Sequence, residues 1–193
     1  MKLLVSLVCM LAFLSTDAQK NADAQKPPTL DQSPMDMSYW PNNYPNLKLD
    51  GKAKASPVAR VIYSRPLKSN RTMLFGKVIP YGQVWRLGAN EATEIEFFRN
   101  VKIGGKLITK GRYTMYYIVE QNMWTIIINN DNYSWGHFSY KSAKDVVRKN
   151  IDIDKNNDVV EAFTMYFEET RSGANLVILW DDVKGVLPIT LVK

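Results

Sequence analysis

The sequence predicts an all-β protein: a single antiparallel β-sandwich, jelly-roll-like, with about ten strands and one long irregular loop. Three observations support this prediction. Short runs rich in β-branched and aromatic residues recur along the chain, and turn residues separate them at intervals of about 8–12 residues. No segment keeps a helical period for more than about ten residues.

Alternation and turn chemistry define the individual strands. Ile95 and Phe97 alternate with glutamates, as in a half-buried strand. Gly104-Gly105 predicts a two-residue hairpin turn. Trp124–Ile128 and Leu176–Trp180 are apolar at nearly every position, which predicts central strands. The predicted strands are residues 58–63, 93–98, 101–103, 106–108, 113–119, 123–129, 134–140, 146–153, 159–167, 176–180 and 186–192.

The N-terminus has the pattern of an export signal. Lys2 precedes an apolar run from Leu3 to Leu14, and Thr16 and Ala18 are small residues at the positions that signal peptidase reads. We therefore expect a signal peptide over residues 1–18. The apolar run is too short to span a bilayer, which needs about 20 residues. The mature chain is expected to be periplasmic or extracellular.

The rest of the chain divides into a linker and one domain. Residues 19–34 are polar and contain proline without an apolar period, which predicts a flexible linker. Residues 35–193 are predicted to form the β-sandwich domain. Residues 35–45 bring Met, Tyr and Trp side chains together among prolines, so we expect an irregular segment packed against this domain.

Composition excludes several chemistries. The only cysteine, Cys9, lies in the predicted signal peptide, so the mature chain is expected to have no thiol nucleophile, thiolate metal site or disulfide. His137 is the only histidine, so the usual zinc ligand set is lacking. Asp152–Asp158 resembles the start of a calcium-binding loop, but Asn157 and Phe163 replace the required Gly and Glu. We predict a hairpin turn there, with no metal and no cofactor.

The net charge of +6 does not by itself indicate a nucleic-acid partner. Lysines and arginines are spread along the chain rather than clustered in a run, and a diffuse excess of this kind is typical of a soluble surface. We predict no nucleic-acid binding.

The long irregular segment that begins at Arg65 and ends before the strand at Thr93 is the best candidate for a site, because long loops without secondary structure of their own are often functional. Guanidinium groups bind carboxylates or phosphates, aromatic rings stack on sugars, and amides and carboxylates bind hydroxyls. The residues predicted to bind a ligand are Arg65, Arg71, Tyr81, Trp85, Arg86, Asn90 and Glu91. In the structural alternative, Arg86 pairs with Glu91 or Glu94 and the loop only braces the sandwich.

Several motifs together resemble a known family. They are YSRP, PYGxVWRxGANEATEI, VKIGGK, GRYT, WTIIIN, WGxFxY, DVVR and GANLVILWDDV followed by LPI. From about Met35 to Lys193 the chain resembles an exported bacterial family, domain of unknown function twenty-nine-eleven, whose members are sometimes mislabelled asparagine synthetase. That label implies an N-terminal cysteine nucleophile, which the predicted mature chain lacks. The chain departs from the family pattern at Val119-Glu120 and at His137.

The resemblance implies an exported β-sandwich and no established activity, so two hypotheses remain. The first is a non-catalytic module that binds a glycan or an anionic envelope component through the arginines and aromatic rings of the loop. The second is a carboxylate-dependent hydrolase, acting on a glycan or similar substrate, that uses Glu91 or a neighbouring glutamate. His137 is expected to be an ordinary strand residue.

Overall fold

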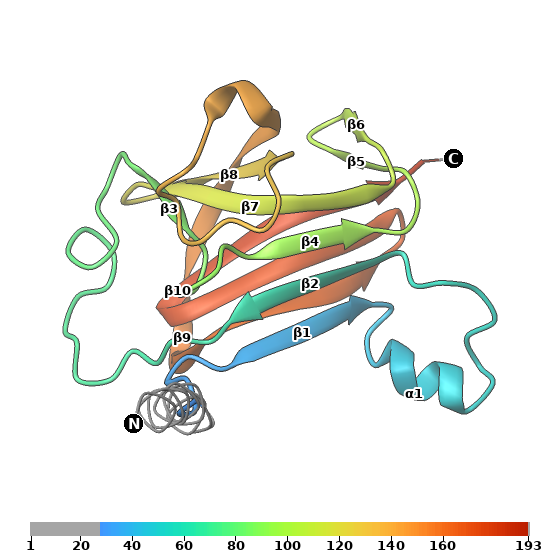
Figure 1. The fold of residues 1–193 in the computed structure, drawn as a ribbon, viewed down its shortest axis with the longest axis horizontal. Helices are drawn as coiled ribbons and strands as arrows, with labels where there is room; N and C mark the ends of the chain where they lie inside the picture. Colours follow the sequence, from blue (N-terminus) through green and yellow to red (C-terminus); the bar gives the residue numbers. More distant parts are fainter. Residues whose placement is uncertain (1–27, 193) are drawn as a thin grey trace, which may run out of the picture. The chain divides into compact units, whose positions relative to one another are not determined.

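The computed structural model describes residues 28–192, which contain ten strands, one short α-helix and one 3-10 turn (Figure 1). The predicted signal peptide and residues 19–27 of the predicted linker lie outside the described residues, and residues 28–34 have no regular secondary structure. The elements are β1 (Met35–Trp40), α1 (Tyr44–Leu49), β2 (Ala59–Ser64), β3 (Val84–Arg86), β4 (Glu94–Phe97), β5 (Val101–Ile103), β6 (Lys106–Ile108), β7 (Gly111–Val119), β8 (Met123–Asn129), the 3-10 turn Ser142–Lys144, β9 (Asp145–Thr170) and β10 (Gly173–Leu191).

Hydrogen bonds join all ten strands into one antiparallel sheet. The order is β1-β2-β4-β7-β8-β9-β10-β5-β6, and β3 pairs with β7 beside this path. The predicted central strands are confirmed, because β8 lies between β7 and β9, and β10 lies between β9 and β5. The structure is mostly β, with one short helix, and its antiparallel pairing is as predicted. The predicted jelly-roll-like sandwich is not shown, because this is a single sheet that does not close on itself.

The long strand β9 connects the two parts of the sheet. Its first residues pair with β8 as far as Asp152, whereas the pairing with β10 extends from Ile153 to Thr170. Two register shifts interrupt the β10 pairing on either side of Asp181, which adopts a left-handed backbone conformation with a φ of 57°. Bulges of this kind bend strands. The distal part of β9 consequently packs on β1 and β2, where Phe167 stacks on Trp40.

Alternation along the strands places the core. On β7 the odd-numbered side chains, among them Tyr117, lie in the main core with Trp124 of β8 and Phe163 of β9. The even-numbered Tyr116 belongs to a second, smaller cluster with Ile127 and Ala92. The chain segments after β3 and after β8 cover this second cluster, so both segments lie on the same side of the sheet.

Four local predictions differ from the structure, each because the sequence does not show a strand's partner. Two were wrong, and two identified strand residues correctly but divided one strand into two. Residues 134–140 form a loop rather than a strand. Residues 146–153 and 159–167 belong to the single strand β9, since the polar stretch between them pairs with β10 through Lys155 and Asp154. The hairpin turn predicted at Asp152–Asp158 is therefore absent from the structure. Residues 176–180 and 186–192 likewise fall largely within β10. Residues 35–40 form the edge strand β1 rather than an irregular segment.

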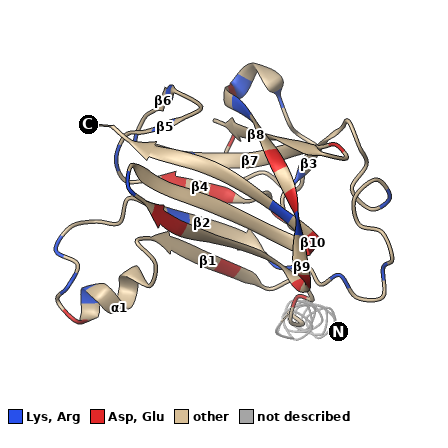
Figure 2. Ribbon diagram, turned by 180° about the vertical axis from the view of Figure 1, so that it is seen from behind, with Lys and Arg blue, Asp and Glu red and all other residues tan. Residues whose placement is uncertain are grey.

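The charged residues are dispersed over the fold. Figure 2 shows Lys and Arg on loops, on α1 and on several strands, with Asp and Glu between them. Within residues 28–192, no helix has the length and apolar character needed to cross a membrane.

The bend in β10 is anchored by an ion pair. Lys68, at the start of the long loop, contacts Asp181 at 2.5 Å, and only 19% and 13% of the two side chains are exposed. The same part of the loop is held to β9 by the bond from the Lys68 amide to the Glu161 carbonyl, 2.7 Å long.

We predict that Asp181→Asn lowers the free energy of unfolding by about 1–3 kcal/mol, because it leaves Lys68 charged and nearly buried without a counterion. Asparagine tolerates the positive φ, so the backbone is not strained. Asp182→Asn is the control, since its pair with Lys155 is largely exposed, and should cost less than about 0.5 kcal/mol. Urea unfolding of both variants measures the difference, and equal losses would contradict the anchoring role.

Candidate functional site

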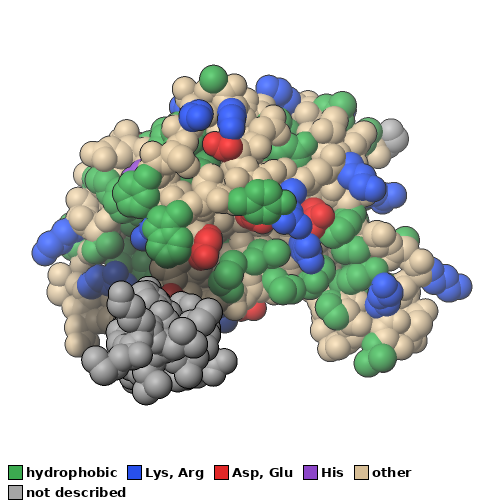
Figure 3. Space-filling model, viewed as in Figure 1, with side chains coloured by type: hydrophobic (Ala, Val, Ile, Leu, Met, Phe, Trp, Pro, Cys, Tyr) green, Lys and Arg blue, Asp and Glu red, His purple; other side chains and the backbone are tan. Residues whose placement is uncertain are grey.

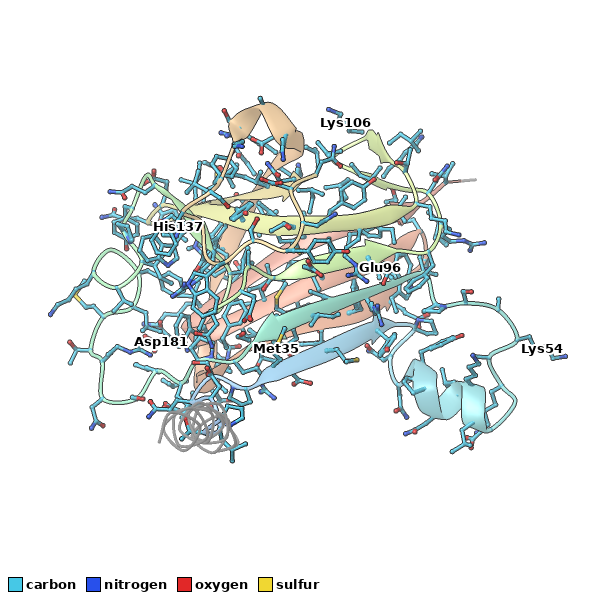
Figure 4. All side chains as sticks on the ribbon, in the orientation of Figure 1. Met35, Lys54, Glu96, Lys106, His137 and Asp181 are labelled. Atoms are coloured by element: carbon cyan, nitrogen blue, oxygen red, sulfur yellow. The ribbon has the colours of Figure 1, made fainter. Side chains whose placement is uncertain are left out.

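Two loops meet at the end of the sheet that carries β3. The first contains residues 87–93 and the second residues 130–141. Gly136 donates its amide to the Asn90 carbonyl and Ala92 donates to the Ser134 carbonyl, both at 2.9 Å. A β-bridge joins Glu91 to Trp135. Figure 4 places His137 at this end, so the pairing brings the second loop next to the predicted site residues.

Arg65 is a bracing residue. Its guanidinium donates to Asp36 of β1 at 3.0 Å, to the Thr164 hydroxyl at 3.0 Å and to the Phe163 carbonyl at 3.2 Å, the last two on β9. These bonds use all three nitrogens of the guanidinium and connect strands that are distant in the sequence. For Arg65 the arrangement favours the structural alternative.

Arg71 has a mixed environment. Its guanidinium donates to the carbonyls of Leu67 and Lys68 and lies 5.6 Å from the centre of the Trp180 ring. It also lines a hollow of about 560 Å³ with Ala89 and other residues of the loop. This hollow does not contain Arg65, Arg86 or Glu91, so the predicted residues do not converge on one cavity.

The predicted aromatic residues lie in different settings. Tyr81 is 38% exposed, and its ring covers Gly76, where a Cβ would lie 2.5 Å from the ring. Trp85 of β3 packs against the main core and stacks on His137, with ring centroids 4.1 Å apart and planes at 30°. His137 stacks in turn on Phe138 at 4.8 Å. The result is a row of three rings that runs from the core toward solvent.

The surface around this row is apolar. Phe138 is 75% exposed and Trp135 is 56% exposed. In Figure 3, hydrophobic side chains gather around the histidine at the end of the sheet where Figure 1 places β3. We call Trp85, Trp135, His137 and Phe138 the ring surface.

Sequence reasoning missed three members of the ring surface, because residues 134–140 were expected to form a strand. The signal that could have identified a loop is Gly136, which adopts a φ of 59°. A Cβ at this position would lie 2.9 Å from the Phe138 ring and 3.1 Å from Nη1 of Arg86. Only glycine fits both the conformation and the space.

Arg86 follows Trp85 and is not paired as the structural alternative requires. No ion pair joins it to Glu91, Glu94 or any other carboxylate in residues 28–192. Among residues 28–192, the only hydrogen bond of its guanidinium is a long contact of 3.4 Å from Nη1 to the Asn90 carbonyl, which also accepts the Gly136 amide. Arg86 and Asn90, both predicted to bind a ligand, are thus brought together by the backbone.

Nε of this guanidinium is buried and has no hydrogen-bond partner in the described part of the chain. The same holds for the hydroxyl of Tyr117 and Nδ1 of His137, whose side chains both lie within reach of the Arg86 charge. Burial lowers the pKa of Arg86. Burial raises the pKa of Tyr117, and the charge of Arg86 partly offsets that rise. Burial and then the charge of Arg86 lower the pKa of His137. Near neutral pH the cluster therefore holds one cation and neutral Tyr117 and His137.

Glu91 lies at a separate hollow of about 240 Å³. Glu94 lines the same hollow, together with Met35, Ile62, Ala92, Tyr133 and Ser134. Glu94 accepts the Tyr133 amide at 3.1 Å and contacts Arg112 at 3.6 Å. Two carboxylates thus face one cavity with partly apolar walls. Among residues 28–192 no group of three or more His, Cys, Asp or Glu side chains is placed to hold a metal ion.

We predict that Arg65→Ala lowers the free energy of unfolding by about 1–3 kcal/mol, since it removes three hydrogen bonds, one of them to a carboxylate. Arg86→Met should leave stability within about 0.5 kcal/mol or raise it, because it removes a partly buried charge that has no ion pair. Thermal and urea unfolding measure both. If Arg86→Met destabilised as strongly as Arg65→Ala, Arg86 would also be a brace.

Comparison with curated proteins and with solved structures finds no match. A family model does match, over residues 47–189, and its description is Protein of unknown function (DUF2911). The match includes β2 to β9, most of β10, and both loops of the candidate site. The match confirms the family suggested by the sequence motifs, and the chain belongs to the family of proteins of unknown function DUF2911.

Proposed function

We propose that this protein is a non-catalytic binding module that recognises a glycan of the cell envelope through the ring surface. The observation that carries the proposal is the exposure of Trp135 and Phe138 beside the stacked rings of Trp85 and His137. Exposed apolar side chains that gather at one place mark binding surfaces. The apolar face of a sugar ring can cover such side chains while its hydroxyls remain hydrated.

Rigidity of the surface supports this proposal. Trp85 is anchored in β3 and packs on the core, and the second loop is held by the two backbone hydrogen bonds that form the Glu91–Trp135 bridge. A surface whose rings are already ordered loses little conformational entropy when a ligand binds. Asn90 and Arg86 supply polar groups at its border.

The location of such a ligand depends on export. We propose that residues 1–18 are a signal peptide and that the mature chain lies in the periplasm or outside the cell. Membership of the family neither adds to nor opposes a glycan ligand, because the family has no described function.

The second candidate function is that of a carboxylate-dependent hydrolase. The observation in its favour is that Glu91 and Glu94 line one hollow. A glycosidase uses two carboxyl groups on opposite sides of the bond that breaks. Against this function, Glu94 already binds Arg112 and the Tyr133 amide, so only Glu91 is left without an ion pair in the described range. We therefore place binding first.

We predict that the double variant Trp135→Ala, Phe138→Ala weakens binding to the glycans that the protein retains on a glycan array, by roughly tenfold or more. Its melting temperature should change little, because both side chains are largely exposed. Leu49→Ala is the matched control. Leu49 is 85% exposed on α1, at the other end of the sheet in Figure 1. Equal binding by the double variant and the control would reject the ring surface as the site.

The hydrolase hypothesis is tested by release of reducing ends from the same glycans. For a binding module we expect no release above that of buffer, and the same result for Glu91→Gln. Release by the wild-type protein that Glu91→Gln abolishes, with binding intact, would establish the hydrolase instead.

A further inference from the structure

We propose that Arg86, Tyr117 and His137 form a binding site for the carboxylate group of an acidic sugar, next to the ring surface. This inference deepens the proposed function and depends on it for the sugar, but not for the carboxylate site itself. It rests on the environment of Arg86, which differs from that of the other partly buried arginines.

Most partly buried arginines of the described chain are neutralised by a carboxylate. The pairs are Arg60 with Glu96, Arg65 with Asp36, and Arg112 with Glu94 and Glu96. The exposed Arg148 is paired as well, with Asp145. Arg86 makes no such pair within residues 28–192. Arg71 also lacks one, but carbonyls accept its Nε and Nη2 hydrogens and its guanidinium faces Trp180. Arg86 combines an unbalanced charge with an unbonded, buried Nε.

The other unbonded atoms around Arg86 complement an anion. The Tyr117 hydroxyl is completely buried and stays protonated, so it is a donor. Nδ1 of His137 is a donor when it carries the ring proton. Buried donors without acceptors are costly. An incoming acceptor with a negative charge satisfies the guanidinium and its neighbouring donors at once.

The cluster is reached from solvent through its partly exposed members. Arg86 and His137 are half-buried, and Tyr117 lies behind them in the core. A Cβ at Gly136 would lie 3.1 Å from Nη1 of Arg86, so the backbone of the second loop lies close against the guanidinium. A ligand group therefore approaches from the side of the half-buried Arg86 and His137.

A carboxylate fits this site better than a phosphate. One guanidinium and two neutral groups balance a single negative charge, and the planar fork of arginine matches the two oxygens of a carboxylate. Trp85 precedes Arg86 in the chain and belongs to the ring surface. A uronic acid, which carries its carboxylate on the sugar ring, can thus contact the rings and Arg86 together.

His137 provides a direct test because it is the only histidine in the sequence. Its imidazole signals can be followed by NMR across pH without ambiguity. A carboxylate bound beside Arg86 favours the protonated imidazole, so the pKa of His137 should rise. We expect glucuronate to raise it, acetate to raise it at higher concentration, and glucose to leave it unchanged.

Two variants and one control define the site. Arg86→Met should raise the pKa of His137 without ligand, since a nearby positive charge is removed, and should abolish the response to glucuronate. Tyr117→Phe keeps the buried ring and should weaken glucuronate binding roughly 10-fold. Arg71→Met, which removes the other arginine of the loop without an ion pair, should respond to glucuronate like the wild-type protein.

The carboxylate site and glycan binding by the ring surface can be tested independently. A glucuronate response that persists in the Trp135→Ala, Phe138→Ala variant supports the carboxylate site even if the ring surface binds no glycan. An unchanged His137 pKa with both glucuronate and acetate would overturn the carboxylate site, whether or not glycans bind to the rings. A response to phosphate that exceeds the response to glucuronate at equal concentration would also overturn it.

Discussion

The continuous pairing of β9 with β10 connects the two parts of the sheet, and the rest of the molecule depends on it. Neither strand is apolar along its whole length, and the polar middle of β9 remains extended because β10 satisfies its backbone groups. The register shifts at Asp181 bend this ladder and bring Phe163 and Phe167 onto β1 and β2. The core forms between these parts of one sheet, without a disulfide in the described residues.

The long loop between β2 and β3 is secured to this bend by its charged side chains. Lys68 binds Asp181, Arg65 links β1 to β9, and Arg71 covers Trp180. Charges that look like a ligand site in the sequence thus hold an irregular segment on the core. Such a segment has few backbone partners of its own, so side chains replace the ladder that a strand would have.

Arg86 is the exception, and the ring surface lies beside it. The two loops meet through backbone hydrogen bonds, which fix Asn90 and Gly136 next to each other. The guanidinium of Arg86 has a buried Nε without a hydrogen-bond partner in the described chain, as have the Tyr117 hydroxyl and Nδ1 of His137. A partly buried arginine that serves only as a brace is normally neutralised by a carboxylate. An unneutralised charge beside exposed, ordered rings is the arrangement that a ligand with an apolar face and one negative charge would stabilise.

The sequence by itself determined the antiparallel β class, most strand positions, the central strands and the family, because these depend on local alternation, turn residues and recurring motifs. It also located the loop that contributes Arg86 and Asn90. It did not reveal that Arg65 is a brace, that Glu91 faces a different hollow, or that residues 134–140 form the second half of the site. Those facts depend on which distant backbone and side-chain groups meet. Only the tertiary structure decides those pairings, since a donor and its acceptor can be separated by a hundred positions in the chain.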